Sequence, residues 1–214
     1  MKTVTVIGGT GYVGSHLVAA AADRGFKVTS LSRRAPEESV EGVDYLIGDV
    51  TDAEVMQEAL AGADAVISAL SPRGNMAGEV LPTLHALADA ARESGVRLGV
   101  IGGAGSLLIA PGGPALYDTP EFHPDWLSEA KEMGAVLADL RAAEEDLDWF
   151  FVSPPRTFGS YVPGEHLGRY RVGGDVVLTD DHGNSTISGS DFAEAVLDEI
   201  ERPAHRRQRF TVAY

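Results

Sequence analysis

The residues whose types and spacing most directly suggest chemistry are glycines near the amino terminus. The stretch Gly8-Gly9-Thr10-Gly11-Tyr12-Val13-Gly14 lies between an apolar run, Thr3–Ile7, and a helical pattern. A glycine loop between a buried strand and a helix can bind a pyrophosphate, because free N–H groups at the helix start point at the phosphates. Gly8 would form the tight turn, Gly11 would allow close backbone approach, and Gly14 would let the helix pack on the strand. The alternative is a glycine-rich turn that binds no ligand. The motif predicts a dinucleotide whose pyrophosphate is held by Gly8, Thr10, Gly11, Tyr12, Val13 and Gly14.

The residues after the second predicted strand indicate which dinucleotide would bind. An acidic residue about 20 positions beyond the glycine loop bonds the ribose 2′-hydroxyl of NAD. This chain instead has Ser32-Arg33-Arg34 in that region. Guanidinium groups match the oxygens of a 2′-phosphate, whereas a carboxylate would repel them. We therefore expect NADP(H) rather than NAD(H), with Arg33 and Arg34 at the 2′-phosphate. The alternative, strongest for Arg34, is a solvated loop charge.

Other strand ends should complete the cofactor site, because ligands of open parallel sheets lie outside the carboxyl ends of the strands. Asp49 and Val50 follow the third predicted strand, where the Asp49 carboxylate could accept from the adenine amino group. The alternative role of Asp49 is a helix cap. Small residues at later strand ends would leave room for the nicotinamide half. The further expected contacts are Ala69, Leu70, Ser71, Gly103 and Pro154.

The elements that must position these residues alternate between short β-branched runs and helical patterns, which predicts a doubly wound, mostly parallel α/β sheet of the Rossmann type. We expect one domain over 1–214, with 154–189 as a small annex on the substrate side, and a binding loop over 103–125. Ser190 is the expected cap of the last helix. A hairpin is expected from Arg169–Val172 and Val176–Leu178. The other predicted strands are Thr3–Ile7, Lys27–Leu31, Asp44–Ile47, Ala65–Ala69, Arg97–Ile101, Trp149–Val152 and Arg209–Ala213, and the predicted helices are Tyr12–Arg24, Asp52–Ala61, Gly78–Ser94, Trp126–Glu145 and Asp191–Glu201.

Composition excludes several classes of function. The chain has 214 residues, a formal net charge of −15 and no cysteine. The acidic surface argues against nucleic acid as the partner, and the lack of thiols excludes disulfides and thiolate metal sites. The histidines show no metal-ligand spacing, and we expect no metal. No apolar run is long enough to span a membrane. We expect a cytoplasmic monomer or homodimer acting on a small molecule; a signal peptide over the first residues is the alternative that the glycines argue against.

Several motifs together carry a family resemblance. They are GGTGYVG at 8–14, SRR at 32–34, GDVTD at 48–52 and SALSP at 68–72. In these segments the chain resembles the atypical short-chain dehydrogenase/reductase superfamily. The short length, the Pro154-Pro155 pair and the tail ISGSDFAEAVLDEIE at 187–201 are similar to a small NAD(P)H-binding branch with NADH-flavin reductases, biliverdin reductase B and NmrA-like proteins. The resemblance covers essentially the whole chain and implies NAD(P)H binding.

The chain departs from this superfamily at the catalytic pair. Typical members use Tyr-x-x-x-Lys, in which the Tyr protonates the substrate oxygen and the Lys lowers its pKa and holds the nicotinamide ribose. This chain has three lysines, and the residues four positions earlier are Leu127 for Lys131 and Asp23 for Lys27, while Lys2 has none. The missing acid argues against ketone reduction, epimerisation and sugar dehydration. Lys131 could still reach the ribose; otherwise it is a solvated helix residue that pairs with Glu129 or Glu132.

A missing acid favours an acceptor that spreads charge over a conjugated system, such as a flavin or quinone, because such an acceptor mainly needs close stacking. Flat side chains for stacking, each of which could equally anchor its loop, are Leu107, Leu108, Tyr117, Phe122, Trp126, Phe158 and Tyr161. The catalytic residues stay unknown, with weak candidates Lys131, Ser106 and Tyr117. Two further hypotheses stay open. One is a non-catalytic NADP(H)-binding sensor of the NmrA-like type, and the other is an isomerase or dehydratase with a relocated acid.

Overall fold

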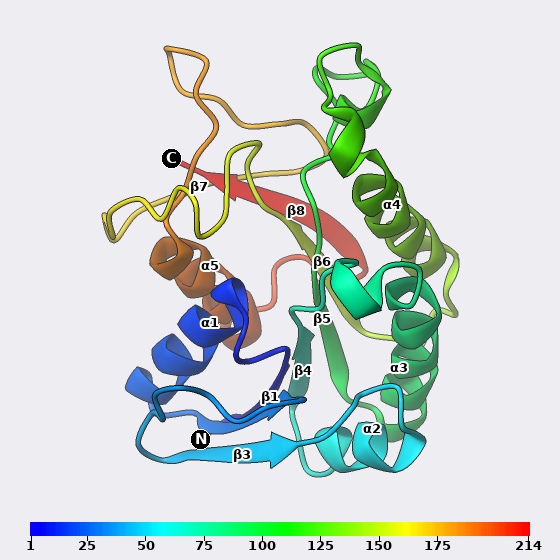
Figure 1. Cartoon of the computed structure of the whole chain (residues 1–214), viewed down its shortest axis with the longest axis vertical. Helices are drawn as coiled ribbons and strands as arrows, with labels where there is room; N and C mark the ends of the chain where they lie inside the picture. The colour runs from blue at the N-terminus through cyan, green and yellow to red at the C-terminus, as the bar shows by residue number, and fades with distance from the viewer.

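Short strands alternate with helices along almost the whole chain, as the sequence predicts (Figure 1). The computed structural model describes residues 1–214. Its strands are β1 (Thr3–Ile7), β2 (Lys27–Ser32), β3 (Val43–Ile47), β4 (Ala65–Ser68), β5 (Arg97–Ile101), β6 (Trp149–Ser153), β7 (Arg171–Gly173) and β8 (Gln208–Ala213). Its α-helices are α1 (Tyr12–Asp23), α2 (Ala53–Leu60), α3 (Val80–Ser94), α4 (Leu127–Ala142) and α5 (Gly189–Glu201). Short 3₁₀ turns lie at η1 (Gly74–Met76), η2 (Leu116–Asp118) and η3 (Pro124–Trp126).

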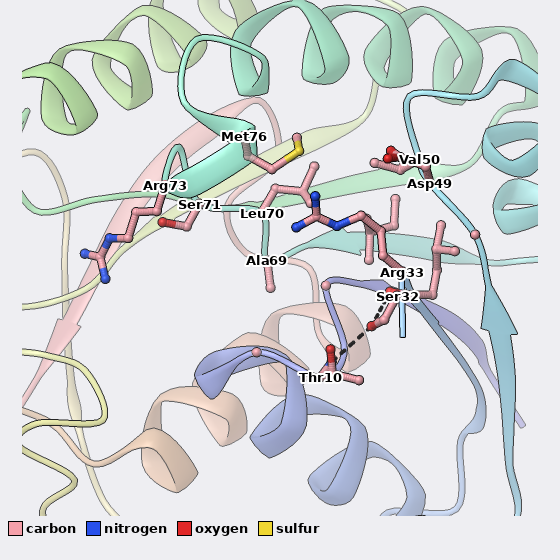
Figure 2. Close-up of a pocket in the computed structure, with 15 residues that line it drawn as sticks. Thr10, Ser32, Arg33, Asp49, Val50, Ala69, Leu70, Ser71, Arg73 and Met76 are labelled. Carbon is pink, nitrogen blue, oxygen red and sulfur yellow. Dashed lines mark hydrogen bonds between the residues drawn. The ribbon is translucent and has the colours of Figure 1, made fainter. Parts of the chain in front are cut away.

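All strands join one sheet in the order β3-β2-β1-β4-β5-β6-β8-β7, and every pair except β7–β8 is parallel. The chain winds outward from β1 through β2 to β3, then returns to β4 on the other side of β1. This reversal creates a switch point at the carboxyl ends of β1 and β4, which is where ligands of such sheets bind. The cavity shown in Figure 2 opens at this point. The predicted doubly wound fold is confirmed.

Helices cover both faces of the sheet, with α1 and α5 on one side and α2, α3 and α4 on the other (Figure 1). Alternate residues of each central strand therefore enter different cores. In β6, Phe150 packs with the α1 and α5 residues, whereas its neighbour Phe151 packs with those of α3 and α4. Both side chains are fully buried. This burial on two faces explains why the strands are continuous apolar runs rather than alternating ones. No helix combines the length and the apolar character needed to cross a membrane.

Two sequence predictions about local structure are wrong. The expected hairpin from 169–172 and 176–178 does not form, because β7 pairs antiparallel with β8, with Val172 opposite Val212. Val176 instead forms an isolated bridge with Leu108 of the long loop after β5. The cap of α5 is Ser188 rather than Ser190, since the Ser188 hydroxyl accepts from the Asp191 N–H at 3.1 Å. The expected binding loop over 103–125 contains η2 and part of η3.

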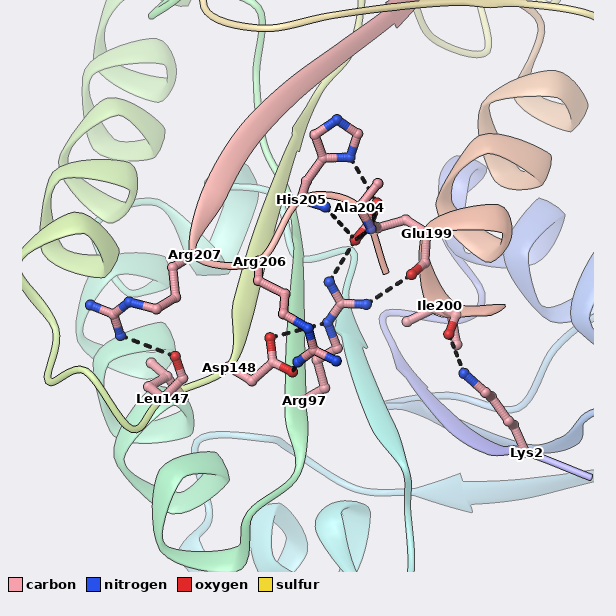
Figure 3. Close-up of polar contacts among 10 residues, drawn as sticks. All are labelled: Lys2, Arg97, Leu147, Asp148, Glu199, Ile200, Ala204, His205, Arg206 and Arg207. Atoms are coloured by element: carbon pink, nitrogen blue, oxygen red, sulfur yellow. Dashed lines mark hydrogen bonds and ion pairs between the residues drawn. The ribbon is translucent and has the colours of Figure 1, made fainter. Parts of the chain in front are cut away.

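A buried ion pair lies at the amino-terminal end of the sheet and links β5 to α5 (Figure 3). The Arg97 guanidinium, at the start of β5, donates to the Glu199 carboxylate of α5 at 2.6 Å and to the Glu199 carbonyl at 2.8 Å. The two side chains are only 8% and 3% exposed. The His205 ring contacts the same carboxylate at 2.7 Å. Burial by itself raises the pKa of Glu199, but hydrogen bonds from the His205 backbone and from Arg97 outweigh it, so the pKa lies below its ordinary value.

Replacing Glu199 with glutamine should destabilise the fold strongly. Glu199→Gln leaves the Arg97 cation buried without its nearest counter-ion, and we expect a loss of about 3 kcal/mol in the free energy of unfolding. Because the pKa of Glu199 is lowered in the fold, its contribution is present above the ordinary carboxyl pKa of about 4 and is lost as the pH falls through the folded value. Urea unfolding at neutral and acidic pH measures both effects.

The matched control is Glu93→Gln, because Glu93 is exposed and forms no ion pair. Its stability should stay within about 0.5 kcal/mol of the wild type. Equal stabilities of the two variants would show that the Arg97–Glu199 pair contributes nothing to the fold.

Candidate active site

A cavity lies across the carboxyl ends of β1, β2, β3 and β4, at the switch point of the sheet (Figure 2). Its volume is about 280 Å³. Residues from four separate strand ends line it, as expected for a ligand site in an open parallel sheet. They are Ile7, Gly8, Thr10, Gly11, Leu31, Ser32, Arg33, Gly48, Asp49, Val50, Ala69, Leu70, Ser71, Arg73 and Met76.

The glycine loop is shaped by one close backbone approach. Gly8 has a φ of +83°, a conformation that other residues rarely adopt. Its carbonyl oxygen accepts from the Gly11 N–H at 2.9 Å and lies against Gly14, where an added Cβ would come within 2.1 Å of it. The roles expected for Gly8 and Gly14 therefore have a steric cause: the turn and the start of α1 fit together only without side chains.

The start of α1 leaves donors free toward this loop. Gly11 is the N-cap residue, no side chain caps the helix, and its first turn contains no acidic residue. An uncapped helix start has N–H groups without partners and a positive dipole end, and both favour an anion. Ser32 fixes the loop to the end of β2, because its hydroxyl oxygen accepts from the Thr10 N–H at 3.1 Å. An uncapped helix start of this kind suits a phosphate group.

Charged residues lie at the β2 and β3 end of the cavity. Arg33 lines it and reaches toward Leu70 in Figure 2, whereas Arg34 is exposed and does not line it. Hydrogen bonds from the Thr51 backbone and hydroxyl, aided by the Arg33 charge, lower the pKa of Asp49, so it is a carboxylate at neutral pH. The alternative role of Asp49 as a helix cap is wrong, because Asp52 caps α2 by accepting from Glu54 N–H at 2.9 Å.

Some expected contacts lie outside the cavity wall, namely Tyr12, Val13, Gly14, Arg34, Gly103 and Pro154. Tyr12 turns toward the annex, where its ring meets Phe158 edge-on at 5.6 Å. The cavity also contains residues that sequence reasoning did not single out as contacts, of which Arg73 and Met76 matter most. These two lie between β4 and α3, just beyond the SALSP segment at 68–72, and neither belongs to that motif. Ser32, which also lines the cavity, belongs to the Ser32-Arg33-Arg34 segment that the sequence analysis singled out.

The weak catalytic candidates do not line the cavity. Lys131 is exposed on α4 and has no ion pair, so its expected pairing with Glu129 or Glu132 is wrong. The Ser106 hydroxyl accepts from the buried Arg209 guanidinium at 3.0 Å. The Tyr117 ring packs beside Gly105 and Gly134, where an added Cβ would lie 3.3 Å and 3.2 Å from it.

Of the side chains expected to stack against an acceptor, two are packed within the protein and two are exposed. Leu107 is fully buried, and Phe158 lies between Tyr12 and Phe192, with ring centroids 4.7 Å apart in the second pair, so both anchor their loops. Trp126 and Tyr161 are 55% and 68% exposed, although the Trp126 ring also contacts the His123 ring, with centroids 5.2 Å apart.

Comparison with known proteins identifies the family. A sequence profile described as NAD(P)H-binding matches residues 8–203. The chain belongs to this NAD(P)H-binding family. The family match confirms the resemblance drawn from the glycine motif and indicates a nicotinamide cofactor. The residues lining the cavity suit such a group, because uncapped helix N–H groups and an arginine lie where phosphates would be held.

Individual relatives agree with this assignment over nearly their whole length. The Bacillus subtilis protein YwnB is 36% identical over 98% of this chain and 97% of its own. A structure from Bacteroides thetaiotaomicron, described as a candidate epimerase, is 37% identical with a TM-score of 0.89, covering 100% and 97% of the two chains. Another, from Streptococcus pneumoniae, is described as a candidate NADH-flavin reductase and is 31% identical with a TM-score of 0.85, covering 100% and 99%.

The close approach at the glycine loop gives a direct test of the site. Gly14→Ala places a Cβ against the Gly8 carbonyl, so the turn or the helix must shift. We expect about 1–3 kcal/mol lower stability and NADPH binding weakened by about tenfold or more. Thermal unfolding and calorimetric titration with NADPH measure these effects. Gly174→Ala is the control, because nothing lies within 4 Å of its added Cβ. Wild-type affinity in Gly14→Ala would contradict the assigned loop.

Proposed function

We propose that this protein is an NADP(H)-dependent oxidoreductase that transfers hydride to a planar conjugated acceptor, flavin- or quinone-like, without a Tyr-x-x-x-Lys acid. The observation that carries this proposal is the set of titratable groups in the cavity wall. It contains two arginines and one carboxylate, Asp49, whose pKa is lowered. None of these groups can donate a proton to a substrate oxygen near neutral pH. The wall thus suits hydride chemistry that needs no positioned acid.

The cofactor half of the proposal rests on the glycine loop and on Arg33. The uncapped start of α1 would hold the pyrophosphate, with Gly8, Thr10 and Gly11 in contact with it. Arg33 would bind the 2′-phosphate and Asp49 with Val50 the adenine, at the β2 and β3 end of the cavity. Arg34 is exposed near Arg33 and would assist it. When bound, NADPH supplies the hydride.

The nicotinamide half would lie along the ends of β4, β5 and β6. Ala69, Leu70 and Ser71 line the cavity there. Gly103 follows β5 and Pro154 follows β6, so both lie at the same end of the sheet and would flank the ring. The work of these residues is positioning: they hold the ring so that an acceptor can stack against it, and they leave the proton to solvent.

A second candidate function is an NADP(H)-binding sensor without catalysis, in the manner of NmrA-like proteins. The same absence of an acid in the cavity wall favours it. Reduction of an added acceptor separates the two proposals, because a sensor would bind NADPH without oxidising it. An isomerase or dehydratase is less favoured, since it needs the acid that the wall lacks.

The Arg33 assignment predicts a cofactor-specific loss. Arg33→Ala removes charge-assisted hydrogen bonds to the 2′-phosphate, and we expect NADPH affinity to fall about tenfold while NADH affinity changes less than about twofold. Calorimetric titration of each cofactor measures the two constants. The matched control is Arg202→Ala, whose arginine is 79% exposed at the far end of α5. An equal loss for both cofactors, or a wild-type preference for NADH, would contradict the 2′-phosphate role.

The reductase proposal predicts turnover with a flat acceptor. Anaerobic NADPH oxidation by flavin mononucleotide, riboflavin or a quinone should follow Michaelis–Menten kinetics, whereas simple ketones should give no rate. Because Asp49, the one carboxyl group in the cavity wall, has a lowered pKa and stays ionised over this range, kcat should vary less than about threefold from about pH 6 to about pH 8. Binding of NADPH with no oxidation by any acceptor would refute the reductase and support the sensor.

A further inference from the structure

Arg73 is a cation at the end of the cavity that the cofactor assignment does not use. It follows β4 and lies on the opposite side of the cavity from Asp49 and Val50, as Figure 2 shows. The adenine and 2′-phosphate are assigned to that other side, which leaves Arg73 at the end where the acceptor would enter. Its guanidinium points past Ser71, away from Arg33 (Figure 2).

A carboxylate on α4 sets the orientation of this guanidinium. Glu129 accepts from the Arg73 Nε at 2.7 Å, and this hydrogen bond is the main reason why the pKa of Arg73 is raised above its ordinary value. The Nη1 and Nη2 groups form no hydrogen bond within the protein, and the Arg73 side chain is 71% exposed. Glu129 thus occupies one edge of the guanidinium and leaves the terminal N–H groups free for a ligand.

The backbone beside Arg73 is tied to the same helix. One turn beyond Glu129, the Glu132 carboxylate accepts from the N–H groups of Gly78 and Val80 at 2.8 and 2.9 Å. These contacts attach the β4–α3 segment to α4. Arg73 is therefore held by an anchored segment and by its own ion pair, which lowers the entropy cost of binding a ligand there.

A flat, exposed ring lies near this cation. The Tyr161 ring covers Gly159, where an added Cβ would come within 2.8 Å of the ring, yet Tyr161 is 68% exposed. Tyr161 lies near enough to Arg73 to be the smallest of the causes that raise the pKa of the guanidinium. The free donors of Arg73 suit an anionic group, and the exposed Tyr161 ring in the same region suits a planar one.

We propose that Arg73, positioned by Glu129, binds an anionic group of the hydride acceptor, so that the acceptor is a conjugated ring system carrying a phosphate or carboxylate. This inference rests on the proposed function, whose acceptor class it narrows. With a net charge of −15, the protein as a whole repels such a ligand, and local donors must overcome that field. Glu129 cancels part of the Arg73 charge, so Arg73 selects by directed hydrogen bonds more than by net charge.

Flavin mononucleotide and riboflavin test the proposal, because they share one ring system and differ in a phosphate. Both are titrated into protein saturated with NADP⁺, with quenching of flavin fluorescence as the signal. The wild type should bind flavin mononucleotide about tenfold more tightly than riboflavin. Arg73→Ala should remove this preference, change riboflavin affinity less than about twofold and leave NADPH affinity unchanged.

Two further variants separate contact from positioning. Arg73→Lys keeps the positive charge but lacks the planar set of guanidinium donors. It should therefore retain part of the preference for flavin mononucleotide that Arg73→Ala loses. Glu129→Gln should raise KM for flavin mononucleotide with kcat unchanged, because it loosens the guanidinium without removing it. Arg202→Ala, which removes an exposed arginine far from the cavity, should behave as the wild type. Thermal unfolding of all variants checks the fold.

Three results would overturn the Arg73 assignment: equal wild-type affinities for the two flavins, an equal loss of both in Arg73→Ala, or weaker NADPH binding in that variant. The last result would place Arg73 in the cofactor site. Failure of the proposed function has a different signature. A wild type that prefers flavin mononucleotide but oxidises no NADPH would refute the reductase and retain the Arg73 site.

Discussion

The whole site depends on the contact between the Gly8 carbonyl and Gly14. An added Cβ at Gly14 would lie 2.1 Å from that oxygen, so α1 can begin this close to β1 only because the residue has no side chain. The close start aims the helix N-terminus at the switch point between β1 and β4. It also places Thr10 within hydrogen-bond distance of Ser32, which links the loop to the strand end that carries Arg33. One steric constraint thus connects the phosphate site to the residues that would distinguish two cofactors.

The two ends of the sheet differ in whether their charged and donor groups are paired within the protein. At the amino end, the buried charges of Arg97 and Glu199 satisfy each other, and His205 adds a further contact. At the carboxyl end, the start of α1 is uncapped and Arg73 keeps its terminal N–H groups free. The N–H groups at the carboxyl end are open to solvent and available to a ligand, which marks this end as the candidate functional side. The ion pair at the amino end helps to hold the sheet together, and the cavity at the carboxyl end depends on that sheet.

The sequence predicted what is encoded locally and missed what depends on distant partners. The glycine motif, the strand-helix alternation and a helix that begins near Asp52 are recognisable because each signal lies within a few residues. The β7 segment was misassigned because its partner strand, around Val212, comes much later in the chain. Arg73 was missed for the same reason: its orientation depends on Glu129, which belongs to α4 and is adjacent only in the fold. Pattern reasoning finds the phosphate loop but cannot place a side chain whose role is set by tertiary contacts.

The distribution of acids and bases in the cavity wall bears most directly on the chemistry. A substrate whose oxygen gains charge on receiving hydride needs a proton donor within reach, and the wall offers only Asp49, held ionised by Thr51. A conjugated ring delocalises the charge that it gains with the hydride, so it does not need a proton donor at one atom. An anionic substituent on the ring would be bound by Arg73. The lack of a proton donor in the cavity wall and the free guanidinium N–H groups of Arg73 are therefore both consistent with an anionic, conjugated acceptor. Both features follow from which side chains the ends of β3 and β4 present to the same cavity.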